Sequence, residues 1–70
     1  MKKLTLTFLG RDNCSRPVYE GDDGRLYVDV DPRDIDHEPS IYTKSSNSFD
    51  GEPATPVHAD ITFVPHRDTW

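Results

Sequence analysis

The residues of this chain that are best suited to chemistry are the carboxylates crowded between Asp29 and Glu38. Carboxylate oxygens are the ligands that Ca²⁺ prefers, and an EF-hand loop takes acidic residues at positions one, three and five with glycine at position six. Counted from Asp29, position five is Arg33 and position six is Asp34, so the spacing does not match. We therefore interpret the run as a solvated acidic surface, with a weak cation site between Asp29 and Glu38 as the alternative.

Cysteine and histidine supply a second candidate chemistry, a Cys–His nucleophile pair or a zinc site. The chain holds Cys14, His37, His58 and His66, and no two of them stand at a spacing that brings them together locally. No catalytic residue, metal ligand or cofactor-binding residue is therefore predicted. A small metal-dependent enzyme is the least favoured function, and the chain is expected not to be an enzyme.

Charge separates one segment from the rest of the chain. Residues 20–38 hold eight acidic and two basic residues, a local charge of −6 against a net charge of −5 for all 70 residues. The remaining sequence is close to neutral and has no stripe of lysine and arginine with interleaved aromatic residues. Nucleic-acid backbones are bound mainly through such basic residues, so direct DNA or RNA binding is disfavoured. A basic protein suits an acidic segment better as a partner.

The segments that must position these residues have the alternating pattern of β-strands. Leucine and phenylalanine alternate with lysine and threonine over residues 2–9, which predicts a strand with one face on a core. Two further runs flank a Gly-Asp-Asp-Gly sequence, and they predict a hairpin of residues 16–20 and 25–31. The remaining predicted strands are a brief one at 41–43 and a last one at 59–64, whose Ala59, Ile61 and Phe63 are expected to face inward.

These strands predict an all-β chain that forms one small domain over residues 1–70, with little or no helix. Its fold is expected to be an antiparallel sheet of four or five strands, or a partly open barrel of the SH3-like kind. Residues 44–57, which contain three serines and two prolines, are expected to form an irregular loop. The core must be thin, because Leu, Ile, Val and Phe make up only 15 of the 70 residues.

The hairpin predicts a candidate interaction face. Alternation places Tyr27, Asp29 and Asp31 on one side of the second hairpin strand and the leucine and valines on the other. If the first side points outward, together with Tyr19 from the neighbouring strand, it presents an aromatic and acidic patch; the alternative is that the tyrosines cover the core. With loop residues added, the candidate interaction face comprises Tyr19, Tyr27, Asp29, Asp31, Asp34, Asp36, Phe49, Asp50 and Trp70.

Location is constrained by cysteine usage and hydropathy. A single cysteine forms no internal disulfide, which fits the reducing cytosol, so a cytoplasmic protein is predicted. Residues 4–9 alternate with threonine and are shorter than the apolar segment of a signal peptide. No run approaches the ~20 apolar residues of a membrane span, and no membrane association is predicted. The terminal Trp70 is expected either to plug an open barrel end or to anchor an interface.

Four stretches carry a resemblance that covers most of the chain. They are residues 16–20 (Arg-Pro-Val-Tyr-Glu), 24–33 (Gly-Arg-Leu-Tyr-Val-Asp-Val-Asp-Pro-Arg), 49–53 (Phe-Asp-Gly-Glu-Pro) and 67–70 (Arg-Asp-Thr-Trp). In these stretches the chain resembles short uncharacterised proteins of gut bacteria and their mobile elements. The resemblance implies a free-standing bacterial or phage-type domain, and it brings no activity, cofactor or catalytic residue with it.

The function expected from these features is a non-catalytic protein–protein interaction module. It would present the acidic hairpin face and residues 49–56 to a protein partner. The alternative is an acidic DNA mimic, whose carboxylates imitate the spacing of phosphates and occupy a nucleic-acid-binding protein.

Overall fold

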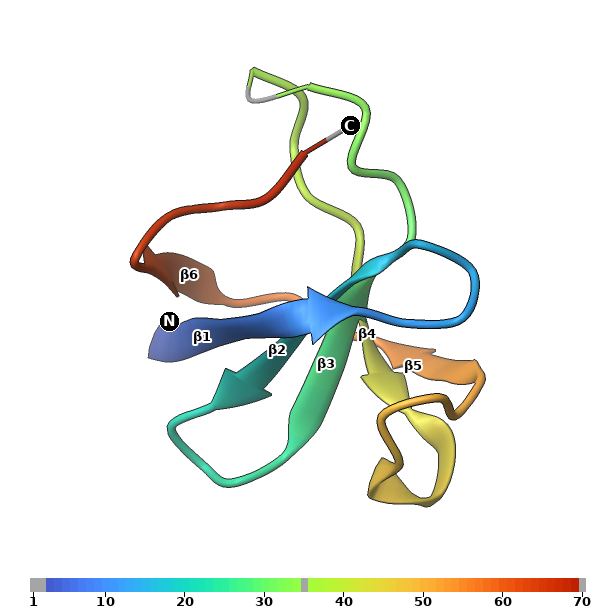
Figure 1. Cartoon of the computed structure of the whole chain (residues 1–70). Coiled ribbons are helices and arrows are strands. Elements are labelled where there is room, and N and C mark those ends of the chain that lie inside the picture. Colours follow the sequence, from blue (N-terminus) through green and yellow to red (C-terminus); the bar gives the residue numbers. More distant parts are fainter. Residues whose placement is uncertain (1–2, 35, 70) are drawn as a thin grey trace.

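A computed structural model, which describes residues 3–34 and 36–69, shows six strands in one curved sheet (Figure 1). The strands are β1 (Lys3–Arg11), β2 (Pro17–Gly21), β3 (Leu26–Asp29), β4 (Ile41–Lys44), β5 (Pro53–Pro56) and β6 (Asp60–Val64). The short 3₁₀ helix η1 (Ser45–Asn47) is the one helical element in these two ranges, and no helix there has the length and apolar character to cross a membrane. The prediction of an all-β chain with little helix is confirmed.

The sheet is mixed rather than antiparallel. Its strands lie in the order β5-β4-β3-β2-β1-β6, and the consecutive strands β1 to β5 pair antiparallel. The last strand, β6, pairs parallel to β1, with Leu4 opposite Ile61 and Leu6 opposite Phe63. The predicted antiparallel sheet of four or five strands is therefore wrong in both details. The reason is that the chain crosses from β5 at one edge to the other edge over residues 57–59, and so enters β6 in the direction of β1.

The strand β5 lies within residues 44–57, which the sequence predicts to be an irregular loop. Tyr42 is opposite Pro56 and Lys44 is opposite Pro53, with a shift of register between the two pairs. Proline has no backbone N–H, and a strand that contains it is tolerated at the edge of a sheet, where β5 lies. The two prolines therefore set the place of this strand in the sheet.

The predicted hairpin is confirmed as β2 and β3, in which Tyr19 lies opposite Tyr27. Two glycines shape its turn. Gly24 has a φ of +82°, in the left-handed region that favours glycine. A side chain at Gly21 would have no room, because a Cβ atom there would lie 2.6 Å from a ring carbon of Tyr27.

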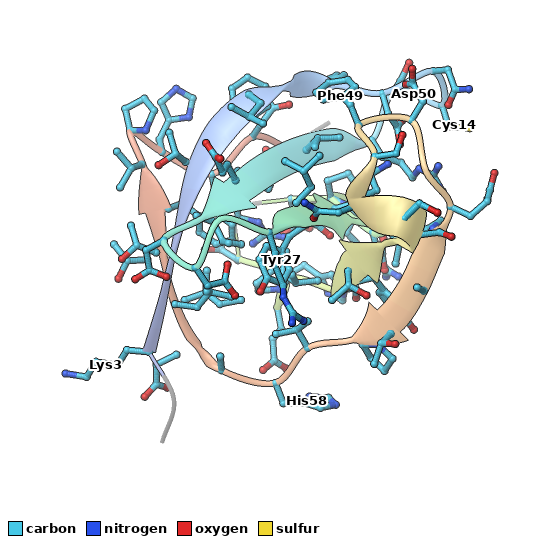
Figure 2. The ribbon with its side chains drawn as sticks, turned by 90° about the horizontal axis from the view of Figure 1, so that it is seen from below. Lys3, Cys14, Tyr27, Phe49, Asp50 and His58 are labelled. Carbon is cyan, nitrogen blue, oxygen red and sulfur yellow. The ribbon has the colours of Figure 1, made fainter. Side chains whose placement is uncertain are left out.

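The inner, concave face of the sheet carries the hydrophobic core. Leu4, Leu6, Tyr19, Tyr27 and Ile41 are each at most 2% exposed. Figure 2 shows Tyr27 inside the space that the strands enclose. The half-buried hydrophobic side chains that pack against this core are Phe8, Val57, Ala59, Ile61 and Phe63. The inward side predicted for the last strand is thereby confirmed.

The opposite face of the hairpin is buried as well. Val18 and Val28 alternate with the tyrosines along β2 and β3, and both are fully buried. Val18 is opposite Gly10 in the sheet, and a Cβ atom at Gly10 would lie 3.7 Å from the ring Cζ of Phe49. The loop between β4 and β5 therefore brings its aromatic side chain against this second face.

Beyond β6 the chain crosses one end of the sheet toward the connection between β3 and β4 (Figure 1). The Asp68 backbone N–H donates to the Tyr19 hydroxyl (2.9 Å), and the Arg11 guanidinium donates to the Asp68 carboxylate (2.9 Å). The guanidinium of Arg67 donates to the carbonyl oxygen of His37. Residues 65–69 are thus held against the core by polar contacts.

Since both faces of β3 are buried, Val28→Ala should lower the free energy of unfolding by about 2 kcal/mol. The same substitution at Val64, which is 40% exposed on β6, should cost less than about 0.5 kcal/mol. Urea unfolding followed by circular dichroism measures both variants. Equal losses at the two positions would contradict the burial of the second face.

Candidate functional site

Three residues of the candidate interaction face lie in the interior. Tyr19 is 0% exposed, Tyr27 is 2% exposed and Asp29 is 0% exposed. The interpretation that this side of the hairpin points outward is therefore wrong, and the alternative that the tyrosines cover the core is confirmed. The reason is the curvature of the sheet, which encloses this side, while Val18 and Val28 occupy an equally buried second side. Burial, with Asp23 accepting the hydroxyl hydrogen bond, raises the pKa of Tyr27 to about 12.

Asp29 has a structural role, and not the predicted role on an exposed interaction face. Its Oδ1 accepts hydrogen bonds from the backbone N–H groups of Asp31 (3.0 Å) and Ser40 (3.2 Å), the two ends of the connection between β3 and β4. Its Oδ2 lies 3.5 Å from Arg67 Nη2, and both side chains are buried. A buried carboxylate needs such partners to remain charged, so Asp29 fixes this connection and the C-terminal segment together.

The exposed carboxylates of the predicted face lie on the connection between β3 and β4. Asp34 and Asp36 are exposed, and Asp31 is partly buried. The Asp31 carboxylate pairs with Arg33 Nη2 (2.6 Å) and lies 3.2 Å from His37 Nε2. The hydrogen bond from Arg33 lowers the pKa of Asp31. We call residues 31–38 the acidic loop.

Phe49 and Asp50 lie in another part of the molecule. The acidic loop is at the top of Figure 1, whereas residues 45–52 form the loop between β4 and β5 at its lower right. Asp50 is exposed and accepts a hydrogen bond from the Asn13 backbone N–H (3.2 Å), while Phe49 is half-buried. The structure therefore does not unite the predicted residues on one face. Trp70, the last of them, lies outside the described residues.

A buried ion pair, which the sequence interpretation missed, fixes the loop that carries Phe49. Lys44 Nζ donates to Asp12 Oδ2 (2.7 Å) and to the Gly51 carbonyl (3.0 Å), and both side chains of the ion pair are fully buried. Asp12 also accepts hydrogen bonds from the backbone N–H groups of Cys14 (2.9 Å) and Arg16 (3.0 Å). Burial opposes the ionisation of Asp12, but these donors outweigh it and lower its pKa to about 2. Asp12 and Lys44 are 32 residues apart, so no local spacing signals the pair.

An open groove of about 710 Å³ lies where the sheet fails to close between β5 and β6. We call it the β6 groove, and it is lined by residues 37–42, 56–61 and Phe63. Its apolar lining comprises the buried Ile41 and half-buried side chains at the margin of the core, while Glu38, His58 and Asp60 on its lining are exposed. Sequence reasoning missed this groove, although the inward pattern of Ile61 and Phe63 was visible.

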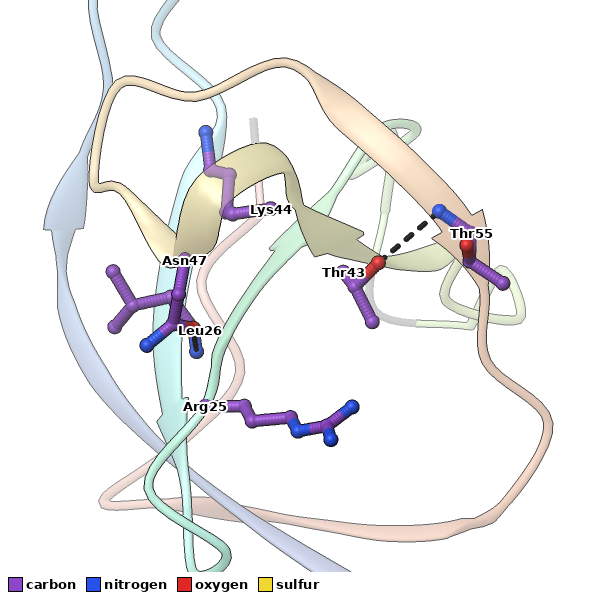
Figure 3. Close-up of a pocket in the computed structure, with 6 residues that line it drawn as sticks. All are labelled: Arg25, Leu26, Thr43, Lys44, Asn47 and Thr55. Atoms are coloured by element: carbon purple, nitrogen blue, oxygen red, sulfur yellow. Dashed lines mark hydrogen bonds between the residues drawn. The ribbon is translucent and has the colours of Figure 1, made fainter.

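A second hollow, of about 490 Å³, is bordered by β3, β4 and β5 (Figure 3). Three of its polar side chains, those of Thr43, Lys44 and Asn47, have partners in the protein. The Asn47 side chain accepts a hydrogen bond from the Leu26 backbone N–H (2.7 Å), and the Thr43 hydroxyl accepts one from the Thr55 backbone N–H (3.1 Å). We therefore assign these two side chains to holding neighbouring segments together.

The residue types of a metal or nucleophile site are dispersed. Within residues 3–34 and 36–69 no three His, Cys, Asp or Glu side chains are grouped so as to hold a metal ion. Cys14 is exposed and lies beside Phe49 and Asp50 in Figure 2, on the side of the molecule opposite His58.

Comparison of the chain with protein-family models, with curated proteins and with solved structures found no match. The site is therefore argued from its own geometry. Of its features, the acidic loop and the β6 groove are adjacent, since His37 and Glu38 belong to both.

The lowered pKa of Asp12 predicts acid-sensitive stability. Because the folded-state pKa lies near 2 and the ordinary value is 3.8, ionised Asp12 stabilises the fold above pH 4, and this contribution is lost as the pH falls toward 2. Its size is about 2 to 3 kcal/mol. The difference in unfolding free energy between the native protein and Asp12→Asn should therefore shrink by that amount between pH 5 and pH 2.

The measurement is urea unfolding over this pH range, with Asp50→Asn as the matched control on an exposed acid near the same turn. The control should stay within about 0.5 kcal/mol of the native protein at neutral pH. A constant difference between the native protein and Asp12→Asn down to pH 2 would show that the pair is not formed.

Proposed function

We propose that this chain is a non-catalytic protein-binding module that takes a basic partner on the acidic loop and the adjoining β6 groove. The observation that carries the proposal is the exposed Glu38 on the lining of a groove with apolar walls, in the same loop as the exposed Asp34 and Asp36. Protein interfaces combine an apolar centre with a polar rim, and charge complementarity selects the partner. We propose the cytosol as the compartment, since the one cysteine of the chain, Cys14, is exposed and forms no disulfide, which suits a reducing environment.

The fold divides the acidic segment between two ends of the hairpin. Glu20, Asp22 and Asp23 lie at the turn between β2 and β3, whereas the acidic loop follows β3 at its other end. Only the acidic loop adjoins the β6 groove. This division supports binding of the partner at one place, the acidic loop and the adjoining groove. The DNA-mimic alternative, which needs acids along one extended face, stays a prediction.

Reversing charge at the acidic loop should weaken partner binding. Asp36→Lys with Glu38→Lys changes two exposed acids for which no hydrogen bond within the protein is described. We expect at least about a tenfold loss of partner recovery at low salt, because two attractive contacts become repulsive. The measurement is a tagged pull-down from lysate of the source organism at low and moderate salt, with captured proteins identified by mass.

The matched control is Glu20→Lys with Asp22→Lys, which changes the net charge equally at the far end of the hairpin. We expect this control to retain the partner, and the partner itself to be basic and released at moderate salt. Equal loss with both variants would indicate a nonspecific charge effect and contradict the proposed surface. Recovery of a nucleic-acid enzyme or repressor that both variants release would favour the DNA mimic.

A further inference from the structure

The two edges of the sheet differ in their capacity to accept another strand. One edge is β5, in which Pro53 and Pro56 lack the backbone N–H that a neighbouring strand would need. The other edge is β6, whose sequence Asp60–Val64 contains no proline and is rich in β-branched and aromatic residues. No described strand pairs with its outer side. Extension of the sheet is therefore favoured at β6.

The direction of the backbone polar groups follows from the hydrogen bonds of β1. The Asp22 backbone N–H donates to the Thr5 carbonyl (3.0 Å), so the polar groups of Thr5 point toward β2. Successive residues of a strand direct these groups to opposite sides. Those of Leu4 and Leu6 consequently point toward β6.

The same rule identifies the unpaired groups of β6. In a parallel pair, a residue bonds to the two residues that flank its register partner. Leu4 is opposite Ile61 and Leu6 is opposite Phe63, so both bond to Thr62 between them. The N–H and C=O groups of Ile61 and Phe63 therefore point away from β1, toward the outer edge.

The side chains of these same two residues line the β6 groove. Ile61 and Phe63 are half-buried and pack against the core, and the Phe63 ring centroid lies 5.0 Å from that of Tyr19. A strand laid along β6 directs every second side chain to the inner face of the sheet. Apolar side chains of such a strand would thus extend the core over the exposed parts of Ile61 and Phe63.

Charge around the groove specifies the kind of strand. Glu38 and Asp60 are exposed on its lining, and Asp36 is exposed in the adjoining acidic loop. Lys3 is opposite Asp60 in the sheet, and the buried side chain of Arg67, which contacts the His37 carbonyl, lies 3.5 Å from Asp29. Besides its two histidines, the charged side chains described on the lining are the carboxylates of Glu38 and Asp60. A second copy of this chain would bring like charges together, whereas a segment with lysine or arginine would meet opposite ones.

We propose that an extended basic segment of a partner protein adds to the outer edge of β6 as a further strand of the sheet. The backbone groups of Ile61 and Phe63 bind its main chain, the β6 groove takes its alternate apolar side chains, and Glu38 and Asp60 face its cations. This inference rests on the proposed function and specifies how the partner is held.

The probe is the peptide acetyl-Lys-Val-Lys-Val-Lys-Val-Lys-amide, added to the full chain and followed by amide hydrogen exchange in NMR. Without peptide, the amide of Thr62 should exchange slowly and those of Ile61 and Phe63 rapidly. At ten times the Kd, exchange of the Ile61 and Phe63 amides should slow about tenfold, because the free edge is then rarely open. Unchanged exchange of these two amides at saturation would overturn the proposal.

Two N-methylated peptides make the test specific for the main chain. One peptide carries N-methyl groups on the backbone nitrogens of its valines, and the other carries them on those of its lysines. Because alternate N–H groups of a strand point to opposite sides, only one of these two sets of nitrogens faces β6. We expect one peptide to lose binding and the other to retain it. Loss with the valine-methylated peptide would indicate an antiparallel added strand, and loss with the lysine-methylated peptide a parallel one. Loss with both peptides, or with neither, would overturn strand addition.

A peptide with glutamate in place of lysine separates this inference from the proposed function. We expect its binding to be at least about tenfold weaker than that of the lysine peptide. Salt-dependent binding of the lysine peptide without protection of Ile61 and Phe63 would overturn strand addition alone. Equal binding of the glutamate peptide would contradict the choice of a basic partner as well, and a dimer seen by light scattering without peptide would assign the edge to a second copy.

Discussion

The ion pair between Asp12 and Lys44 joins two parts of the chain that have little apolar surface of their own. Asp12 begins the turn between β1 and β2, and Lys44 is the last residue of β4, directly before the 3₁₀ helix η1. Withdrawing two charges from water is costly, and it is offset only when the remaining hydrogen-bonding positions are filled. Arg16 Nε donates a further hydrogen bond to Asp12 Oδ2 (3.0 Å), and the carbonyl of Gly51 accepts one from the Lys44 ammonium. Loss of Asp12 would leave the Lys44 ammonium buried without a carboxylate partner, whereas loss of Lys44 would leave Asp12 paired with Arg16 alone.

A second buried pair acts in the same way at the other end of the sheet. Asp29 is the last residue of β3, just before the acidic loop, and Arg67 belongs to the C-terminal segment. Neither the acidic loop nor the C-terminal segment forms a strand. A chain of 70 residues buries a smaller share of its surface than a larger domain does, so hydrophobic packing alone gives little to hold such segments in place. Directed polar contacts supply the missing constraint. Two of the thirteen acids, Asp12 and Asp29, are thus buried and hold segments of the fold together.

The success and failure of sequence interpretation follow the range of the interactions involved. Alternation and turn residues act locally, and they predicted β1, the hairpin and the inward side of β6. The direction of β6 depends on how the short connection over residues 57–59 carries the chain from one edge of the sheet to the other, which no local pattern records. Alternation also gave the right division of residues 25–31 into two sides, but both sides are buried, so the sequence could not show which one the sheet encloses. The burial of Asp29 depends on Arg67, which lies 38 positions further along the chain.

The open side of the sheet follows from these constraints. Closing a barrel would require a ladder between β5 and β6, yet Pro53 and Pro56 deny β5 two of the donors that such a ladder uses. The core therefore ends in half-buried side chains, among them Phe63, whose ring meets Tyr19 in the deepest part of the interior. An apolar margin of this kind is stabilised by whatever strand covers it. The incomplete core and the candidate binding edge are consequently one feature, and the prolines of β5 direct any added strand to β6.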